Sequence, residues 1–325
     1  MVVEIVAVGR INIDMIMQVE NLKSRSQHML SKEGQISYGG SAANFASQSS
    51  HLGVKTGLIG CLGNDTYGQM ALKHLQKVGV DTSQVLVLDK HPTGLFFIAY
   101  DADGGEMVIA EPGANRFLDK RVLEEDYFVG TTVIHVAGGF PMMTQRAAEV
   151  ATAEGMILSL DPGRAAAAID YLEIIRSVDL LFVNQNELRT YFKVSPSEKN
   201  LRSFAKEFPG IVVVKQGRSG AIATDGFEYC TSDVFEVPVV DTLGAGDSFA
   251  AGFVTAWTRS ENIEQALHMA NATAALTITK RGAQMGQPSL EEVTTLLSEY
   301  RVSIKRITDT FGKTKRRTQR RRKTK

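Results

Sequence analysis

Cysteine and histidine are scarce in this chain, and their spacing matches no metal site. Of 325 residues, two are cysteines and six are histidines. Cys61 and Cys230 lie in no Cys-x-x-Cys or Cys/His cluster, and the histidines form no His-x-x-x-His set. Neither a disulfide framework nor a zinc site is therefore expected. Because disulfides are rare where thiols are kept reduced, this cysteine usage indicates a cytoplasmic protein.

Long apolar runs are missing as well. The sequence has no stretch of 18 consecutive apolar residues, so no membrane-spanning helix is expected. Its start, Met1 to Gly9, is a short apolar run that contains Glu4 and no basic leader, which predicts a buried strand rather than a signal peptide. The Gly-x-x-x-x-Gly-Lys-Ser/Thr loop and the protein-kinase motifs are also absent, which excludes those two classes of phosphoryl-transfer enzyme.

The formal net charge is zero, but the charges are unevenly distributed. Residues 313–325 hold nine of the 36 basic residues and no acidic residue, so residues 1–312 carry 27 basic against 36 acidic groups. The tail has no apolar residue and is predicted to be disordered. It could make weak, nonspecific contacts with nucleic acid, with an acidic surface or with a neighbouring molecule. A solvated tail without a specific partner is the favoured interpretation.

Short apolar segments alternate with helical patterns along most of the chain. The apolar segments predict strands at Ile5–Val8, Lys55–Ile59, Val85–Leu88, Val133–Ala137, Ile157–Leu160, Leu180–Val183 and Ile211–Lys215. Helical patterns lie between them, for example at Tyr67–Val78, Thr144–Glu154 and Leu201–Glu207. Apolar strands separated by helices predict a doubly wound α/β fold with a mostly parallel sheet between helices. In such folds ligands bind at the carboxyl ends of the strands.

Two stretches break this alternation and predict a second, smaller sheet. Residues 11–38 are rich in polar residues and β-formers. Residues 92–110 contain two β-rich segments around Asp-Ala-Asp-Gly-Gly, which is a hairpin pattern. Residues 219–237 form another hairpin pattern, with Gly226 near its turn.

The most informative stretch is residues 241–252, Asp-Thr-Leu-Gly-Ala-Gly-Asp-Ser-Phe-Ala-Ala-Gly. The small residues Gly244–Gly246 allow a ligand to approach their backbone amides. An apolar helical run, Phe249–Trp257, follows, so these amides would lie at a helix N-terminus, which favours an anion. Asp247 could take a proton from an attacking hydroxyl while the amides hold a phosphoryl group. A capped helix after a glycine turn is the alternative interpretation.

Further motifs lie in the N-terminal third of the chain. The segment 38–44, Tyr-Gly-Gly-Ser-Ala-Ala-Asn, precedes a small-residue helix, and glycine-rich segments follow at 52–60 and 63–68. Together with residues 241–252, these segments resemble the two signatures of the ribokinase-like (PfkB-type) carbohydrate kinases. The resemblance extends from Val8 to Gln284 in the order and spacing of that family.

The resemblance implies a Rossmann-like ribokinase fold over residues 1–312, with a small β-sheet lid built from about 11–38 and 92–110. A lid would exclude water during phosphoryl transfer, and its edge implies a homodimer. Asp247 would be the catalytic base. The anion hole would consist of the amides of Gly244, Ala245 and Gly246. The sugar would be bound by Asn12, Asp14, Gly39, Gly40 and Asn44.

The resemblance also implies a nucleotide side of the site. ATP would lie near Asn184, Lys215, Gly217 and Asn271. Asn184 and Glu187 would hold Mg²⁺, largely through water. Asp241 would lie near a monovalent cation such as K⁺, as in some members of the family. Other interpretations stay open: Asn184 could cap a helix, Asp241 could be a turn residue, and Lys215 and Asn271 could have packing roles.

These assignments predict an ATP- and magnesium-dependent kinase that phosphorylates a primary hydroxyl of a ribose-like sugar. A nucleoside kinase is the alternative, because the lid stretch Leu95–Ile98 could pack on a base. Sugar-phosphate and keto-acid sugar kinases follow, and Arg164 could pair with a phosphate on the substrate. An inactive binding protein with the kinase fold is a hypothesis from another class, against which the intact Asp247 argues. The sequence leaves the choice between ATP and ADP as donor open.

Overall fold

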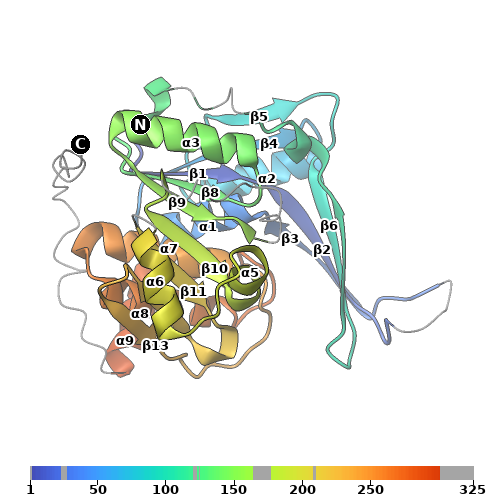
Figure 1. The fold of residues 1–325 in the computed structure, drawn as a ribbon. Coiled ribbons are helices and arrows are strands. Elements are labelled where there is room, and N and C mark those ends of the chain that lie inside the picture. Colours follow the sequence, from blue (N-terminus) through green and yellow to red (C-terminus); the bar gives the residue numbers. More distant parts are fainter. Residues whose placement is uncertain are drawn as a thin grey trace.

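A mostly parallel sheet of nine strands, in the order β13-β12-β11-β10-β9-β8-β1-β4-β5, runs through the middle of the computed structural model (Figure 1). The strands are β1 (Ile5–Gly9), β4 (Thr56–Gly63), β5 (Val85–Leu88), β8 (Val133–Ala137), β9 (Ile157–Asp161), β10 (Leu180–Asn184), β11 (Ile211–Lys215), β12 (Ala221–Thr224) and β13 (Tyr229–Ser232). Strands β11 to β5 pair in parallel, and β12 and β13 continue the sheet antiparallel at one edge. The structure describes residues 2–22, 28–119, 123, 125–163, 177–207 and 210–300. The basic tail 313–325 and Arg164 lie outside the described residues.

Helices cover both faces of this sheet, as the sequence predicts. In β1 the side chains of Ile5 and Ala7 join one core, and those of Val6 and Val8 join the other, because alternate residues of a strand face opposite sides. The first core is covered by α1 (Ser41–His51), α2 (Thr66–Lys77), α7 (Ala245–Ser260), α8 (Ile263–Thr277) and α9 (Leu290–Glu299). The second core is covered by α3 (Pro141–Glu154), α5 (Gln185–Tyr191) and α6 (Glu198–Glu207). Short 3₁₀ turns lie at η1 (Gly113–Phe117), η3 (Glu125–Phe128) and η6 (Gly217–Ser219).

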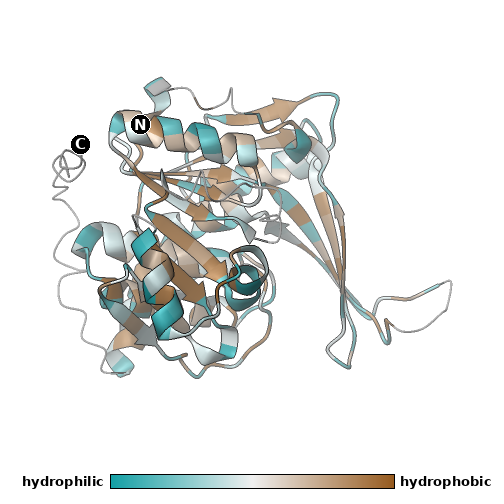
Figure 2. Ribbon diagram, in the orientation of Figure 1, coloured by the Kyte–Doolittle hydropathy of each residue, from teal (hydrophilic) through white to brown (hydrophobic). Residues whose placement is uncertain are grey.

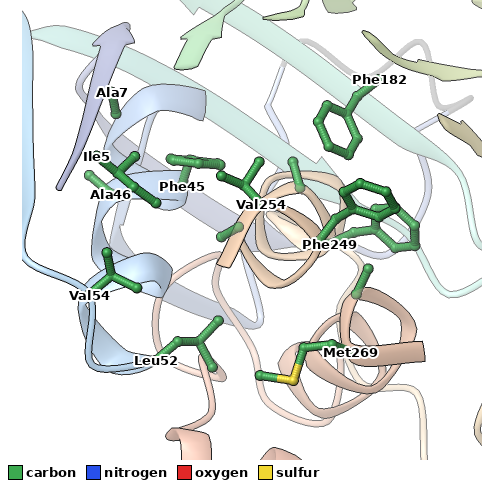
Figure 3. Close-up of a cluster of buried hydrophobic side chains, with 14 of the residues drawn as sticks. Ile5, Ala7, Phe45, Ala46, Leu52, Val54, Phe182, Phe249, Val254 and Met269 are labelled. Atoms are coloured by element: carbon green, nitrogen blue, oxygen red, sulfur yellow. The ribbon is translucent and has the colours of Figure 1, made fainter. Parts of the chain in front are cut away.

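Small residues let α1 and α7 pack closely in the first core. Ala42, Ala43 and Ala46 of α1 and Ala250 and Ala251 of α7 are all buried. Figure 3 shows the aromatic residues around this contact, with Phe45 of α1 and Phe249 of α7 in the same cluster as Phe182 of β10. The apolar strands stand out in Figure 2 between helices whose outer faces are hydrophilic. The packing brings the first turns of α1 and α7 together at one end of the sheet.

A second sheet projects from the main body (Figure 1). Its order is β3-β2-β6-β7, from β3 (Glu33–Gly39), β2 (Asn12–Gln18), β6 (Gly94–Tyr100) and β7 (Glu106–Glu111). The two stretches predicted to form the small sheet therefore pair with each other, through parallel β2 and β6. Both predicted hairpins are confirmed, as β6–β7 and as β12–β13. Among the described residues, no helix combines the length and the apolarity that crossing a bilayer requires.

The helix and strand bounds differ from the sequence prediction by a few residues. Strand β4 continues four residues past Ile59, to Gly63. Helix α3 begins at Pro141 instead of Thr144, with the proline in the first turn, where its missing N–H has no helical partner to lose. Helix α6 begins at Glu198 instead of Leu201. Its first turn is polar, so the sequence shows no apolar pattern there. These differences leave the predicted fold class unchanged.

His135 of β8 is buried inside the first core. Its ring stacks on Phe45, with the centroids 3.7 Å apart, and Nδ1 lies 2.8 Å from the hydroxyl of Ser159. Burial, with a smaller contribution from the charge of the nearby Lys215, lowers the pKa of His135 to about 3. The folded protein therefore holds this imidazole neutral.

We expect the stability of the fold to fall below neutral pH because of His135. In the unfolded chain the imidazole takes up a proton at the ordinary histidine pKa of about 6.5, whereas in the folded protein it stays neutral. The stability linked to this difference is therefore lost as pH falls from about 6.5 toward 3. Between pH 7 and pH 5 the wild type should lose ~2 kcal/mol more than His135→Leu. Urea unfolding of both proteins at the two pH values measures this difference. Equal losses would show that His135 does not resist protonation.

Candidate active site

Polar residues end three neighbouring strands at one edge of the main sheet. Asp161 is the last residue of β9, Asn184 of β10 and Lys215 of β11, and Asn184 pairs in register with Lys215. Lys215 Nζ forms a close ion pair with Asp161 Oδ2. Burial alone would lower the pKa of Lys215, but the carboxylates of Asp161, Glu187 and Asp247 together outweigh burial and raise it. The edge therefore presents a permanent positive charge that is partly neutralised.

The first turn of α7 lies beside Lys215. Gly244 is the N-cap, with a left-handed φ of 72°, and no side chain caps the helix. The amide of Ala245 reaches Thr242 O at 3.3 Å, whereas the amides of Gly246 and Asp247 find no acceptor among the described residues. A Cβ atom added at Gly246 would lie 3.5 Å from Lys215 Nζ. Uncapped amides and a lysine thus face one small space, which suits a phosphate group.

Asp247 stands at this helix start and is held from α1. Its Oδ2 accepts a 2.8 Å hydrogen bond from Asn44 Nδ2. Burial raises the pKa of Asp247 to about 7, with Asp161 and Asp14 adding to the rise, while Asn44 and Lys215 oppose it. A carboxylate with a pKa near the working pH is suited to accept a proton during a reaction.

The predicted sugar-binding residues lie where β2 and β3 meet α1. Asp14 of β2 is buried, and its carboxylate has no hydrogen-bond donor among the described residues. Burial, with a smaller contribution from the charge of Asp241, raises the pKa of Asp14 to about 7. A Cβ atom on Gly39 would collide with this carboxylate, so the glycine is required there. Gly40 is the N-cap of α1, with a φ of 94° and no side-chain cap.

Asn12 is held by a residue that the sequence analysis missed. Asn115 of η1 donates from Nδ2 to Asn12 Oδ1 at 2.9 Å and to Ile11 O at 3.0 Å, and its Oδ1 accepts from Ile11 N at 3.0 Å. This amide therefore fixes the start of β2. Asn115 belongs to no recognisable motif, so its position could be found only from the three-dimensional structure.

Two residues on the nucleotide side are engaged in helix capping. Asn184 Oδ1 accepts from Glu187 N, and Glu187 Oε2 accepts from Asn184 N, both at 2.9 Å. The capping interpretation of Asn184 is therefore confirmed, and the residue can still face a ligand. Within the described ranges, no group of three or more His, Cys, Asp or Glu residues could hold a metal ion by itself. Mg²⁺ would fit here with phosphate oxygens and water as its main ligands, as this ion prefers.

Asp241 acts as a turn residue in this structure. Its Oδ1 accepts from Leu243 N at 3.0 Å, and its Oδ2 accepts from Gly282 N at 2.8 Å. The carboxylate thus ties the loop before α7 to the loop after α8. It also lines a cavity of about 280 Å³ between the second sheet and residues 239–242, together with Tyr100 and Arg281. A role in binding a monovalent cation stays a prediction.

Two of the predicted nucleotide-binding residues, Asn271 and Gly217, have structural roles next to the main sheet. Asn271 of α8 donates from Nδ2 to Ser232 O at 3.0 Å and to Asp233 O at 3.3 Å. Its amide therefore holds the end of β13 against α8, which is the packing role left open above. Gly217 begins η6 directly after β11, with a φ of 59° and open space around its Cβ position. Their contact with a nucleotide stays a prediction.

Known proteins match both the sequence and the fold. The pfkB family carbohydrate kinase model matches residues 3–290. An ATP-dependent ribose-1-phosphate kinase of Halopiger xanaduensis is 32% identical, covering 91% of this chain and 99% of the relative. A nucleoside kinase of Methanothermobacter thermautotrophicus is 28% identical over 95% and 97% of the two chains. A putative ribokinase II of E. coli, solved with ATP and Mg²⁺, superposes with a TM-score of 0.80 at 25% identity, covering 91% of this chain and 99% of that one.

The raised pKa of Asp247 predicts that this carboxylate costs stability. In the unfolded chain the Asp247 carboxyl loses its proton near pH 4, whereas in the folded protein it keeps the proton up to about pH 7. The stability linked to this difference is therefore lost as pH rises from 4 through 7. Asp247→Asn should therefore raise Tm at pH 8, and the gain should vanish near pH 4. Thermal unfolding across this range measures it. A variant less stable than wild type at pH 8 would contradict the assigned cost.

Proposed function

Because the chain belongs to the pfkB family of carbohydrate kinases, we propose that it transfers the terminal phosphoryl group of ATP to the primary hydroxyl of a ribose-like sugar. One observation carries the proposal. The carboxylate of Asp247, with a pKa near 7, is held by Asn44 beside the uncapped amides of α7. This arrangement places a base next to an anion site, which is what phosphoryl transfer to an alcohol needs.

In the proposed mechanism, Asp247 accepts the proton of the attacking hydroxyl. The predicted anion hole of the Gly244, Ala245 and Gly246 amides changes here, because Ala245 N already donates to Thr242 O. The amides of Gly246 and Asp247 and the charge of Lys215 stabilise the negative charge on the transferring group. Mg²⁺ bound with ATP would reduce the charge of the phosphates, with Asn184 and Glu187 positioned to orient its water ligands. The ATP- and Mg²⁺-bound relative from E. coli supports this pair of cofactors.

The sugar would lie against β2 and the start of α1. A buried carboxylate without a donor is costly, so Asp14 is suited to accept hydrogen bonds from sugar hydroxyls. Asn12 offers an amide from the same strand, and Gly39 and Gly40 allow the ring to approach the backbone. Asn44 keeps a second Nδ2 hydrogen for a ligand while the first holds Asp247.

The second sheet would then act as the lid of this site. Its strand β2 carries Asn12 and Asp14, so the strand that binds the sugar is also part of the cover. Excluding water at this point prevents hydrolysis of the nucleotide. Dimerisation through the lid, K⁺ binding and nucleic-acid contacts of the tail 313–325 stay predictions.

The decisive experiment is Asp247→Asn assayed with ATP, Mg²⁺ and ribose. We expect kcat to fall by ~10²–10⁴, the usual contribution of a positioned base. Asp225→Asn is a matched control, because Asp225 accepts from the turn amides of Phe227 and Glu228 between β12 and β13. Near-normal turnover of a folded Asp247→Asn protein would remove Asp247 from the mechanism.

A ribose that already carries a phosphate is a second candidate substrate, and Arg10 favours it. Arg10 directly follows β1, two residues before Asn12, and is half-buried. Its guanidinium lies 5.4 Å from the ring centroid of Phe140, and no carboxylate of the described residues pairs with it. Burial lowers the pKa of Arg10, which indicates a charge that lacks compensation. A guanidinium in this position is suited to a phosphate, and the Halopiger relative is named for such a substrate.

Comparing substrates distinguishes the candidates. The rates with ribose, ribose 1-phosphate and adenosine, each with ATP, are measured for wild type and Arg10→Gln. If the phosphorylated sugar is the substrate, its kcat/KM exceeds that of ribose, and Arg10→Gln lowers it by ~10–100-fold because a charge-assisted contact is lost. Arg116→Gln, at an exposed pair with Glu111, is the control. A preference for ribose that Arg10→Gln leaves unchanged would support the first candidate, and a preference for adenosine would support a nucleoside kinase.

A further inference from the structure

Asp247 is the first of four polar side chains that form an unbroken hydrogen-bonded chain. Asn44 Nδ2 lies 2.8 Å from Asp247 Oδ2, Gln284 Nε2 lies 3.0 Å from Asn44 Oδ1, and His74 Nε2 lies 2.9 Å from Gln284 Oε1. The members come from α7, α1, the loop after α8, and α2. Asn44 and Gln284 are each 5% exposed, so water does not compete for their amides.

The direction of every hydrogen bond in this chain follows from its first member. An ionised carboxylate can only accept, so Asn44 must present its Nδ2 to Asp247 and its Oδ1 to Gln284. Gln284 must then donate from Nε2, which leaves its Oε1 facing His74. His74 must therefore carry a hydrogen on Nε2. The hydrogen on Nε2 of the imidazole is thus matched to a single orientation of the two buried amides, Asn44 and Gln284.

The His74 ring is itself held in place. It stacks on Tyr38, with centroids 3.8 Å apart and planes 6° from parallel. Tyr38 belongs to β3 of the second sheet, one residue before Gly39. Burial lowers the pKa of His74, and the nearby His51 and Lys77 lower it further, while Gln284 opposes this. The neutral ring with its hydrogen on Nε2 satisfies the chain without any change of charge.

We propose that His74 is a positioning residue for the base, acting through Gln284 and Asn44. Without a donor at position 74, Gln284 can rotate its amide by 180° and offer Oε1 to Asn44. Asn44 then has to turn its own oxygen toward the carboxylate of Asp247, and the hydrogen bond that holds the base is lost. This inference rests on the proposed function, because it assigns His74 to the same reaction.

A matched pair of substitutions separates the donor from the ring. His74→Phe keeps the stack on Tyr38 and removes the donor, whereas His74→Gln removes the ring and keeps an amide donor near the place of Nε2. We expect His74→Phe to lower kcat about tenfold, the value of one hydrogen bond to a charged group, with the KM for ATP unchanged. We expect His74→Gln to retain most of the wild-type kcat. His91→Phe is the control, because His91 makes a similar stack on Phe117, outside the chain of hydrogen bonds.

The pH profile gives a readout that lost packing would not produce. The Asn44 hydrogen bond lowers the pKa of Asp247, so its loss should move the acidic limb of kcat/KM to higher pH in His74→Phe and leave it in place in His74→Gln. Gln284→Glu offers a second test that does not depend on His74. A carboxylate at position 284 accepts from both neighbours and turns Asn44 the wrong way, so kcat should fall at least as far as in His74→Phe.

A measurement made without substrate tests the role of His74 separately from the proposed function. The difference in Tm between His74→Phe and His74→Phe/Asp247→Asn, followed from pH 4 to 9, reports the Asp247 carboxylate without any substrate. The pH midpoint of this Tm difference should be higher than the midpoint of the Tm difference between wild type and Asp247→Asn. Inactive wild type with a shifted midpoint would overturn the proposed function alone. Wild-type kcat and an unshifted midpoint in His74→Phe, or equal losses in His74→Phe and His74→Gln, would overturn the role of His74.

Discussion

The hydrogen bond between Asn44 and Asp247 is the contact on which the candidate site depends. Asn44 and Asp247 are 203 positions apart in the sequence. Their hydrogen bond joins α1 to α7 and can form only because the first turns of these helices lie close together. The alanines at their interface permit this approach, since larger side chains would separate the helix axes. Helix α1 then connects Asp247 to the predicted sugar-binding residues, because Gly40, four residues before Asn44, begins this helix beside Gly39 and Asp14.

The electrostatics of the site show a conflict between stability and function. Asp14 is buried and Asp247 is half-buried, and the pKa values of both carboxyl groups are raised to about 7. Each carboxylate destabilises the fold at neutral pH, and neither forms an ion pair with a cation among the described residues. The ammonium of Lys215 is paired with Asp161 instead. Under the proposed function, both carboxylates would act on a ligand, and perturbed pKa values are common at such sites. The large aromatic and aliphatic cores on both faces of the main sheet stabilise the fold and offset the destabilisation by these two carboxylates.

Much of the fold could be predicted from the sequence, because apolar strands, hairpin glycines and the motif at 241–252 are local signals. Helix starts such as Glu198 were missed, since polar first turns show no periodicity. In the site, Asp247 and Asn44 could be named singly, but not their direct contact, which arises from tertiary packing. Gln284 and Asn115 were given no role because a buried amide has no characteristic spacing to its partners. The capping role of Asn184 was foreseen because its partner Glu187 is three residues away.

Under the proposed function, the topology of β2 would couple sugar binding to closure of the second sheet over the site. Asn12 and Asp14 lie in the strand that pairs with both β3 and β6, so the sugar contacts and the covering sheet share one backbone. Under the proposed function, a sugar bound to Asp14 would hold the strand from which the cover is built, whereas water does not present several hydroxyls in a fixed geometry. Stacking of Tyr38 on His74 extends the same link to the residues behind the base. Under the proposed function, the enzyme would complete its anhydrous site when the acceptor is in place, which is the physical requirement for transferring a phosphoryl group to an alcohol in the presence of water.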